Sequence, residues 1–266
     1  MRQFDDLAKP SGHEREIARF FRDHTAFEGA EPIFDTPLYL LGFFNRSGSN
    51  LLSEFLNSTP VFAGFREELN SNIVVQAAGR SAIASFPEYI IQCSDAARSA
   101  GRVYGFKASW AQIAMLLRFK IDRMYPSVRI LHMTRRDVLA QAISYSVAFQ
   151  SKQWTSKMSR AVAEPVFDAR QIQKFMEAAL FSEQAITWIA NIRAIPRHRV
   201  VYEDLVEAPV ETIQEIARFA GFELADWKPG TPKLAKQATE LNAVFRERYL
   251  EHACTKLNLP RGAESR

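Results

Sequence analysis

Cysteine is almost absent from this sequence of 266 residues, which contains only Cys93 and Cys254. Two cysteines cannot build a disulfide framework, and a reducing compartment suits such a chain. No group of cysteine and histidine residues has the spacing of a zinc site, so no metal is expected. These absences exclude small disulfide scaffolds and zinc-binding modules.

Long apolar segments are also missing. No stretch of 18 apolar residues occurs, so no membrane span is predicted. Residues 1–16 lack the apolar region of a signal peptide, and we therefore expect a cytoplasmic protein. No repeat and no linker rich in proline, glycine or serine divides the chain. We expect a single domain over residues 1–266, in which residues 1–36 form an N-terminal extension of unknown role.

A strong excess of one charge is absent as well. The net charge of +4 is too small to indicate nucleic-acid binding, although it suits an anionic ligand. Hydrophobic residues make up 47% of the chain and charged residues 24%, which is typical of a globular protein. A chain of this length can form one large α/β domain with a substantial core.

Short apolar runs alternate along the chain with amphipathic segments. Strands are expected at residues 38–44, 102–107, 128–133 and 199–202. Helices are expected at residues 13–25, 50–56, 110–119, 137–149, 171–195 and 204–220. This alternation predicts an α/β fold, with a P-loop-like parallel sheet flanked by helices on both faces.

The first candidate site is the turn Arg46-Ser47-Gly48-Ser49, which lies where a strand leads into a helix. Backbone N–H groups at a helix N-terminus bind anions, and a glycine lets the backbone approach the ligand closely. The lysine that follows the glycine in nucleotide triphosphatases is absent, because Ser49 and Asn50 stand there. The turn therefore suits a phosphate or phosphosulfate. A serine-capped turn without a ligand is the alternative.

A second candidate site lies at the end of the strand predicted for residues 128–133. Arg135 and Arg136 follow this strand, and Ser144 lies on the next helix. Ligands of such sheets bind at the carboxyl ends of the strands, where both basic turns are expected. Arg135 and Ser144 could hold one phosphate from two sides. The alternative is an arginine pair on the surface and a solvated serine.

Three segments together resemble the sulfotransferases that use 3′-phosphoadenosine 5′-phosphosulfate (PAPS), most closely the bacterial trehalose 2-sulfotransferase type. Residues 39–54 contain Arg-Ser-Gly-Ser-Asn-Leu-Leu, where that family usually has threonine in place of asparagine. Residues 105–112 are similar to its Gly-Lys-x-x-Trp-x-Gln segment. Residues 132–154 contain Arg-Arg-Asp, where the family usually has Arg-Pro-Asp. The resemblance covers residues 38–155 and continues more weakly through residues 202–205.

The resemblance implies a sulfotransferase that moves a sulfuryl group from PAPS to a hydroxyl of a small acceptor, expected to be a sugar or glycolipid. PAP is the expected product, and neither a metal nor a nucleic-acid partner is expected. Arg46 and Lys107 are expected to stabilise charge during the transfer. The residues expected to bind the donor are Arg46, Ser47, Gly48, Ser49, Asn50, Leu51, Arg135, Ser144 and Tyr202. A homodimer remains an open alternative to a monomer.

The acceptor hydroxyl needs a base, and the resemblance implies a glutamate shortly after the first helix. Aligning Ala63-Gly64 with the same pair in the family selects Glu68, with one inserted residue. Counting from Arg46 without a gap selects Glu67 instead. Glu68 is the preferred prediction. His132 is the only histidine beside a motif, but its apolar strand predicts a core residue.

Other functions and contacts remain open at this stage. A P-loop kinase would need a lysine after Gly48, and a non-catalytic adenosine-phosphate binding module would not need the base. The basic stretch from Lys233 to Arg248 could close over the donor or form a solvated helix face. The acceptor walls are expected in residues 60–100 and 150–175. Aromatic residues that could line them, or belong to the core, are Phe62, Phe65, Phe149, Trp154 and Phe167.

Overall fold

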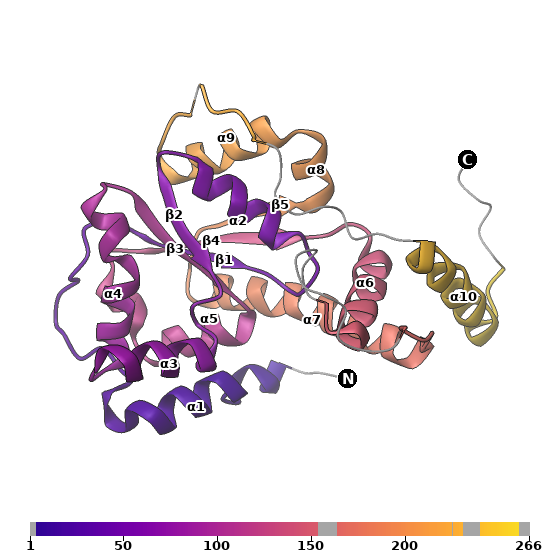
Figure 1. Ribbon diagram of the computed structural model, residues 1–266, viewed down its shortest axis with the longest axis horizontal. Coiled ribbons are helices and arrows are strands. Elements are labelled where there is room, and N and C mark those ends of the chain that lie inside the picture. The colour runs from indigo at the N-terminus through magenta and orange to yellow at the C-terminus, as the bar shows by residue number, and fades with distance from the viewer. Residues whose placement is uncertain (1–3, 154–163, 225, 231–239, 261–266) are drawn as a thin grey trace.

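The computed structural model of the chain describes residues 4–153, 164–224, 226–230 and 240–260 (Figure 1). Its centre is a five-stranded parallel sheet with the strand order β2-β3-β1-β4-β5. The strands are β1 (Leu38–Gly42), β2 (Phe62–Arg66), β3 (Val103–Ala108), β4 (Val128–Thr134) and β5 (Arg197–Val201).

Helices cover both faces of the sheet, as Figure 1 shows, and this confirms the predicted α/β fold. The helices α2 (Ser49–Ser58), α8 (Tyr202–Glu207) and α9 (Pro209–Ala220) lie over one face. The other face is covered by α3 (Ser71–Ser81), α4 (Phe86–Ser99), α5 (Trp110–Arg118) and α7 (Ala169–Ile192). The remaining helices are α1 (Gly12–Phe21), α6 (Val138–Ser151) and α10 (Glu240–Leu257).

The central strand β1 shows why a continuous apolar run becomes a strand here. Successive side chains of a strand point to opposite faces of the sheet. Leu38 and Leu40 belong to the core under α3, α4 and α5, whereas Tyr39 and Leu41 belong to the core under α2 and α9. A strand between two layers of helices must be apolar on both sides, which removes the alternating pattern of a half-exposed strand.

The boundaries of two predicted helices differ from the structure. The helix predicted for residues 13–25 ends at Phe21 and continues as a 3₁₀ turn, Arg22–His24. The helix predicted for residues 204–220 is two helices, α8 and α9, which meet at Pro209. Proline has no backbone N–H and fits the first turn of a helix, so the chain restarts there.

The N-terminal extension packs against the sheet domain through α1. Ser11 and Glu14 form a capping box that starts this helix. Ile17 and Phe21 are buried in the core beside α3 and α5. The buried carboxylate of Glu14 accepts a hydrogen bond of 2.7 Å from Nε of Arg118, at the end of α5. The extension is therefore joined to the sheet domain by both apolar and ionic contacts.

None of the described helices is both long and apolar enough to cross a membrane. Among the same described residues, no cluster of three histidine, cysteine, aspartate or glutamate side chains could hold a metal ion. The single domain over residues 1–266 stays a prediction.

Candidate active site

Two basic turns lie side by side at the carboxyl edge of the sheet. The turn before α2 follows β1, and the turn before α6 follows β4. The strands β1 and β4 are neighbouring parallel strands, with Gly42 paired to His132 at the end of the ladder. Parallel neighbours end at the same edge, so this register brings Arg46 and Arg135 together.

The turn after β1 has the geometry of an anion-binding loop. Gly48 has a φ of 93°, and a Cβ atom added there would lie 2.2 Å from Cδ2 of Tyr202. Only glycine fits this position without strain. The hydroxyl of Ser47 is buried and has no hydrogen-bond partner among the residues that the structure describes. A buried polar atom without a partner is rare, and an anionic oxygen from a ligand would satisfy it.

Arg46, Arg135 and Ser144 meet beside this loop. Nε of Arg46 donates a hydrogen bond of 2.9 Å to the Ser144 hydroxyl, and Nη1 of Arg135 donates one of 3.3 Å to the Arg46 carbonyl. Burial and then the positive charge of Arg135 lower the pKa of Arg46. A bound anion would oppose this decrease in pKa, because its negative charge would lie close to the two guanidinium groups. The predicted residues of the two turns therefore come together.

The segment after β5 contacts the Arg135 side chain through Tyr202 and Glu203. The Arg135 guanidinium lies 4.8 Å from the centre of the Tyr202 ring, a cation–π distance. Its Nε lies 3.6 Å from Oε1 of Glu203, whose other oxygen accepts a 3.0 Å hydrogen bond from the Arg136 backbone. Sequence analysis placed Tyr202 here but did not include Glu203 in the site. The signal in the sequence that could have identified Glu203 is an acidic residue directly after the end of a strand.

A second polar cluster lies beside the loop, at the end of β3. Nζ of Lys107 donates hydrogen bonds of 2.5 Å to Oδ1 of Asn50 and 2.8 Å to Oε1 of Glu67. The Lys107 side chain is only 3% exposed. Burial lowers the pKa of this lysine, although Glu67 opposes the change. Burial alone would raise the pKa of Glu67, but Lys107 and Asn70 together outweigh it and hold that pKa below its ordinary value.

Glu68 lies in different surroundings from Glu67. Its carboxylate accepts a hydrogen bond from the Tyr104 hydroxyl, and its backbone carbonyl accepts one of 2.7 Å from Tyr89. Tyr104 and Tyr89 belong to the core under α3, α4 and α5, on the sheet face opposite α2. Burial raises the pKa of Glu68, while Tyr104 and then Arg66 oppose the change. Glu67, and not Glu68, therefore lies in the polar cluster with Lys107 and Asn50.

The remaining predicted residues are buried or partly buried. Ser49 is buried at the start of α2, and Leu51 packs on the core under that helix. His132 is buried within β4, where its Nδ1 lies 3.0 Å from Nη1 of Arg197. Phe62 and Phe65 are fully buried core residues, so they cannot line an acceptor pocket.

The remaining aromatic and basic candidates lie near α6 and α10. Phe149 is 42% exposed at the end of α6, whereas Phe167 packs against Phe245 of α10. Arg246 of α10 pairs with Asp137, the N-cap of α6, through hydrogen bonds of 3.1 and 2.9 Å. Trp154 and residues 233–237 lie outside the residues that the structure describes.

Comparison with known proteins identifies the family of the chain. The sequence profile of the family described as Stf0 sulphotransferase matches residues 38–252. No curated protein sequence matches the chain. Similar solved structures include the sulfotransferase domain from the curacin biosynthetic pathway, with 14% identity and a TM-score of 0.51, over 73% of this chain and 76% of that one.

Two further structures are a sulfotransferase from Alicyclobacillus acidocaldarius and the sulfotransferase domain of the Synechococcus PCC 7002 olefin synthase. The first has 13% identity and a TM-score of 0.49, over 85% of this chain and 98% of that one. The second has 14% identity and a TM-score of 0.47, over 84% and 98% respectively. At such low identity these likenesses concern the fold alone, whereas the family profile spans most of the chain. The protein is a sulfotransferase and belongs to the Stf0 sulfotransferase family.

Proposed function

We propose that this sulfotransferase takes its sulfuryl group from PAPS and transfers it to a hydroxyl of a small acceptor. The observation that carries the proposal is that two basic turns meet beside a buried hydroxyl with no hydrogen-bond partner among the described residues. Arg46 contacts both Ser144 and Arg135, and the Ser47 hydroxyl lies beside them in the loop. PAPS carries two separate anionic groups, a 5′-phosphosulfate and a 3′-phosphate, and thus suits two adjoining anion sites.

The residues present fit both groups of the donor. The loop from Ser47 to Leu51 offers backbone N–H groups, the free hydroxyl of Ser47 and the close backbone approach at Gly48. This loop would hold the 5′-phosphosulfate. Arg135 and Ser144 would hold the 3′-phosphate, with Tyr202 under the Arg135 guanidinium. Arg46 lies between the two sites and can contribute to either.

In the proposed reaction, the acceptor oxygen forms a bond to sulfur while the bond from sulfur to the 5′-phosphate oxygen breaks. PAP leaves with the bonding electron pair, and the proton of the acceptor hydroxyl moves to a carboxylate. Arg46 and Lys107 stabilise the negative charge that develops on the leaving phosphate. Lys107 already contacts Asn50, in the first turn of α2, and so lies at the loop that would hold that phosphate.

The geometry favours Glu67 as the carboxylate that takes the proton, although the aligned sequence motif favours Glu68. Oε1 of Glu67 lies 2.8 Å from Nζ of Lys107, and its side chain is 44% exposed. The lysine keeps Glu67 ionised and therefore able to accept a proton at neutral pH. Glu68 is bound to Tyr104 on the other face of the sheet.

The resemblance to trehalose sulfotransferases supports a carbohydrate or glycolipid acceptor. A cytoplasmic location and a homodimer remain predictions from the sequence and the resemblance.

Titration calorimetry with PAP and with ATP plus magnesium tests the donor assignment. We expect PAP to bind, and we expect Arg46→Ala and Arg135→Ala to weaken that binding about 10- to 100-fold, since each removes a charge-assisted hydrogen bond. Arg136→Ala is the matched control, because its side chain is exposed and paired with Asp204. It should change affinity less than about threefold.

A screen with ³⁵S-labelled PAPS against sugars, glycolipids and alcohols then tests transfer. Tight binding of ATP with magnesium, and not of PAP, would overturn the donor assignment. Binding of PAP without transfer to any acceptor would indicate a binding module.

A further inference from the structure

The helix α3 begins at an asparagine whose side chain does not cap it. Asn70 is the N-cap residue and has the extended backbone typical of that position, with a φ of −70° and a ψ of 129°. At an N-cap, the side-chain oxygen of asparagine ordinarily accepts a hydrogen bond from a backbone N–H in the first turn of the helix. No such bond is present within the described residues of α3. The Asn70 side chain therefore serves another contact.

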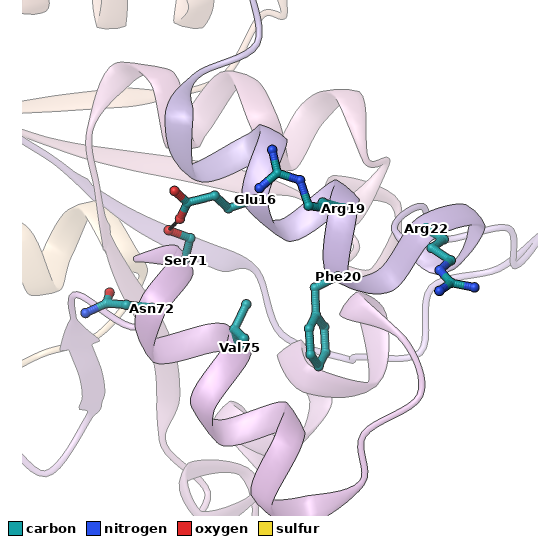
Figure 2. A pocket seen from close by; sticks show the side chains of 7 residues that line it. All are labelled: Glu16, Arg19, Phe20, Arg22, Ser71, Asn72 and Val75. Carbon is teal, nitrogen blue, oxygen red and sulfur yellow. Dashed lines mark hydrogen bonds between the residues drawn. The ribbon is translucent and has the colours of Figure 1, made fainter.

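Contacts with α1 hold the start of α3 in place of a side-chain cap. The Ser71 hydroxyl donates a hydrogen bond to Glu16 of α1, as Figure 2 shows. The Ser71 backbone N–H donates one of 3.1 Å to Nδ1 of His13. The first N–H groups of a helix have no partner inside it, and α1 supplies a partner for the first of them. These contacts fix the residue that directly follows Asn70.

The Asn70 amide belongs to a chain of hydrogen bonds that begins at the start of α5. Oε1 of Gln112 accepts hydrogen bonds of 2.9 Å from the Ser109 backbone N–H and of 3.1 Å from the Ser109 hydroxyl. A backbone N–H can only donate, so the oxygen of the Gln112 amide must lie on this side and its nitrogen on the other. Nε2 of Gln112 then donates a hydrogen bond of 3.0 Å to Oδ1 of Asn70.

The direction of the Asn70 amide follows from the same reasoning. Its oxygen faces the donor Gln112, so its nitrogen faces Glu67 and donates a hydrogen bond of 3.4 Å to Oε2. Oε1 of Glu67 accepts a hydrogen bond of 2.8 Å from Lys107. Gln112 is only 3% exposed, so water has little access to compete for its amide. Both oxygens of the proposed base therefore face donors whose direction is fixed.

Donors at both oxygens favour the ionised form of the carboxylate. Burial raises the pKa of Glu67, whereas Lys107 and Asn70 lower it. Lys107 is the charged side chain that contacts Glu67 among the described residues, and the neighbouring Arg66 acts on Glu68 instead. A carboxylate oxygen can accept a second hydrogen bond, so these contacts still leave Glu67 able to take a proton.

We propose that Asn70 and Gln112 are positioning residues for Glu67, and that their amides form a directed chain from the start of α5 to Oε2 of the base. With Lys107 on Oε1, the carboxylate keeps one orientation beside the loop before α2. A base that is oriented in advance does not have to be ordered during the reaction. This inference rests on the proposed function and concerns the same reaction.

Two variants separate this role from helix capping. Asn70→Ser removes the amide donor but places a good N-cap residue at the start of α3, so the melting temperature should not fall. The pKa of Glu67 should rise in this variant, because Oε2 loses its donor. Ser109→Ala is the opposite control. It removes the side-chain cap of α5 and should lower the melting temperature, but the Ser109 backbone N–H still directs Gln112. The pKa of Glu67 should therefore stay unchanged.

A double variant tests whether Gln112 acts through Asn70. Gln112→Met leaves the Asn70 amide without its directing donor and should raise the pKa of Glu67 by no more than Asn70→Ser does. In Asn70→Ser/Gln112→Met the pKa should equal that of Asn70→Ser, because the second change acts through a side chain that is already removed. A further rise in the double variant would show that Gln112 acts on Glu67 by another route and would contradict the chain.

The pKa of Glu67 is measured in the PAP-bound protein by ¹³C NMR with glutamate labelled at Cδ. The signal of Glu67 is identified by its loss in Glu67→Gln. An equal pKa in the unchanged protein, Asn70→Ser and Gln112→Met would overturn the inference. Equal rises in Ser109→Ala and Asn70→Ser would also overturn it, since general loosening would explain both. The expected changes in pKa, without transfer of label from PAPS to any acceptor, would support the chain and contradict the proposed function.

Discussion

Glu67 and Glu68 are adjacent residues whose carboxylates bind different partners, Lys107 and Tyr104, which makes the pair a direct test of the proposed base. Glu67→Gln should keep PAP binding and lower single-turnover sulfation about 10²- to 10⁴-fold, because the amide cannot accept the proton. Glu68→Gln is the matched control and should keep turnover within a few-fold, since its partner Tyr104 lies in the core. Both variants are assayed by labelled transfer at saturating PAPS.

The opposite result, an inactive Glu68→Gln and an active Glu67→Gln, would restore the residue that the sequence alignment selects. The structure shows why counting could not decide between them. The pairing of β2 with β3 shifts between Gly64 and Arg66, where an extra residue bulges from the strand. One extra residue reverses which side chains face each side of the sheet beyond it. Residue counts and motif alignment therefore give different answers at this position.

His132 lies in the buried middle of β4 and makes the stability of this strand depend on pH. Burial and then the charges of Arg197 and Arg199 lower its pKa from the ordinary 6.5 to about 3. Between these values the unfolded chain binds a proton that the folded protein does not, so stability must fall as the pH decreases. Well below pH 6.5, this residue alone should lower the free energy of unfolding by about 1.4 kcal/mol for each pH unit.

Urea unfolding between pH 7 and pH 4.5 tests this expectation in the intact protein and in His132→Leu. The variant loses the contact with Arg197 at every pH, so only the slope of stability against pH is compared. A shallower slope in His132→Leu is expected. Equal slopes in the two proteins would contradict a neutral buried histidine.

The other elements show how far periodicity alone can predict this fold. The strands at β1, β3, β4 and β5 were predicted because each is a short apolar or β-branched run that ends at a polar turn. The edge strand β2 was not predicted, since it contains the small pair Ala63-Gly64 and the bulge at Phe65, which has a φ of 50°. The helices α3 and α4 were also missed, whereas a basic C-terminal helix was expected where α10 lies. The apolar residues of α3 and α4 contact only one neighbouring layer. Apolar and polar residues therefore mix in these segments, and their sequences resemble those of loops.

At the scale of the whole molecule, motifs reveal the two basic turns but not the position of the N-terminal extension. Arg46, Arg135 and Ser144 could be predicted because strand, turn and helix follow in order at each basic turn. The position of α1 could not be predicted, since it depends on contacts with segments far along the chain, such as that of Glu14 with Arg118. No local pattern encodes such pairs, and residues 1–36 were therefore left without a role.

These distant contacts predict that α1 unfolds together with the sheet domain. Ile17 has no exposed surface and packs in the core beside α3 and α5. Ile17→Ala should lower the free energy of unfolding by about 2 to 5 kcal/mol, the usual cost of a cavity in a core. The transition should stay single and should coincide when followed by far-ultraviolet circular dichroism and by tryptophan fluorescence. Arg19→Ala on the exposed side of α1 is the control and should change stability by less than about 0.5 kcal/mol.

A separate early transition in Ile17→Ala, with the main transition unchanged, would show that α1 is a unit of its own and that the single-domain prediction is wrong. If the transitions coincide, α1 and the sheet domain form one cooperative unit, as the buried contact of Glu14 with Arg118 predicts.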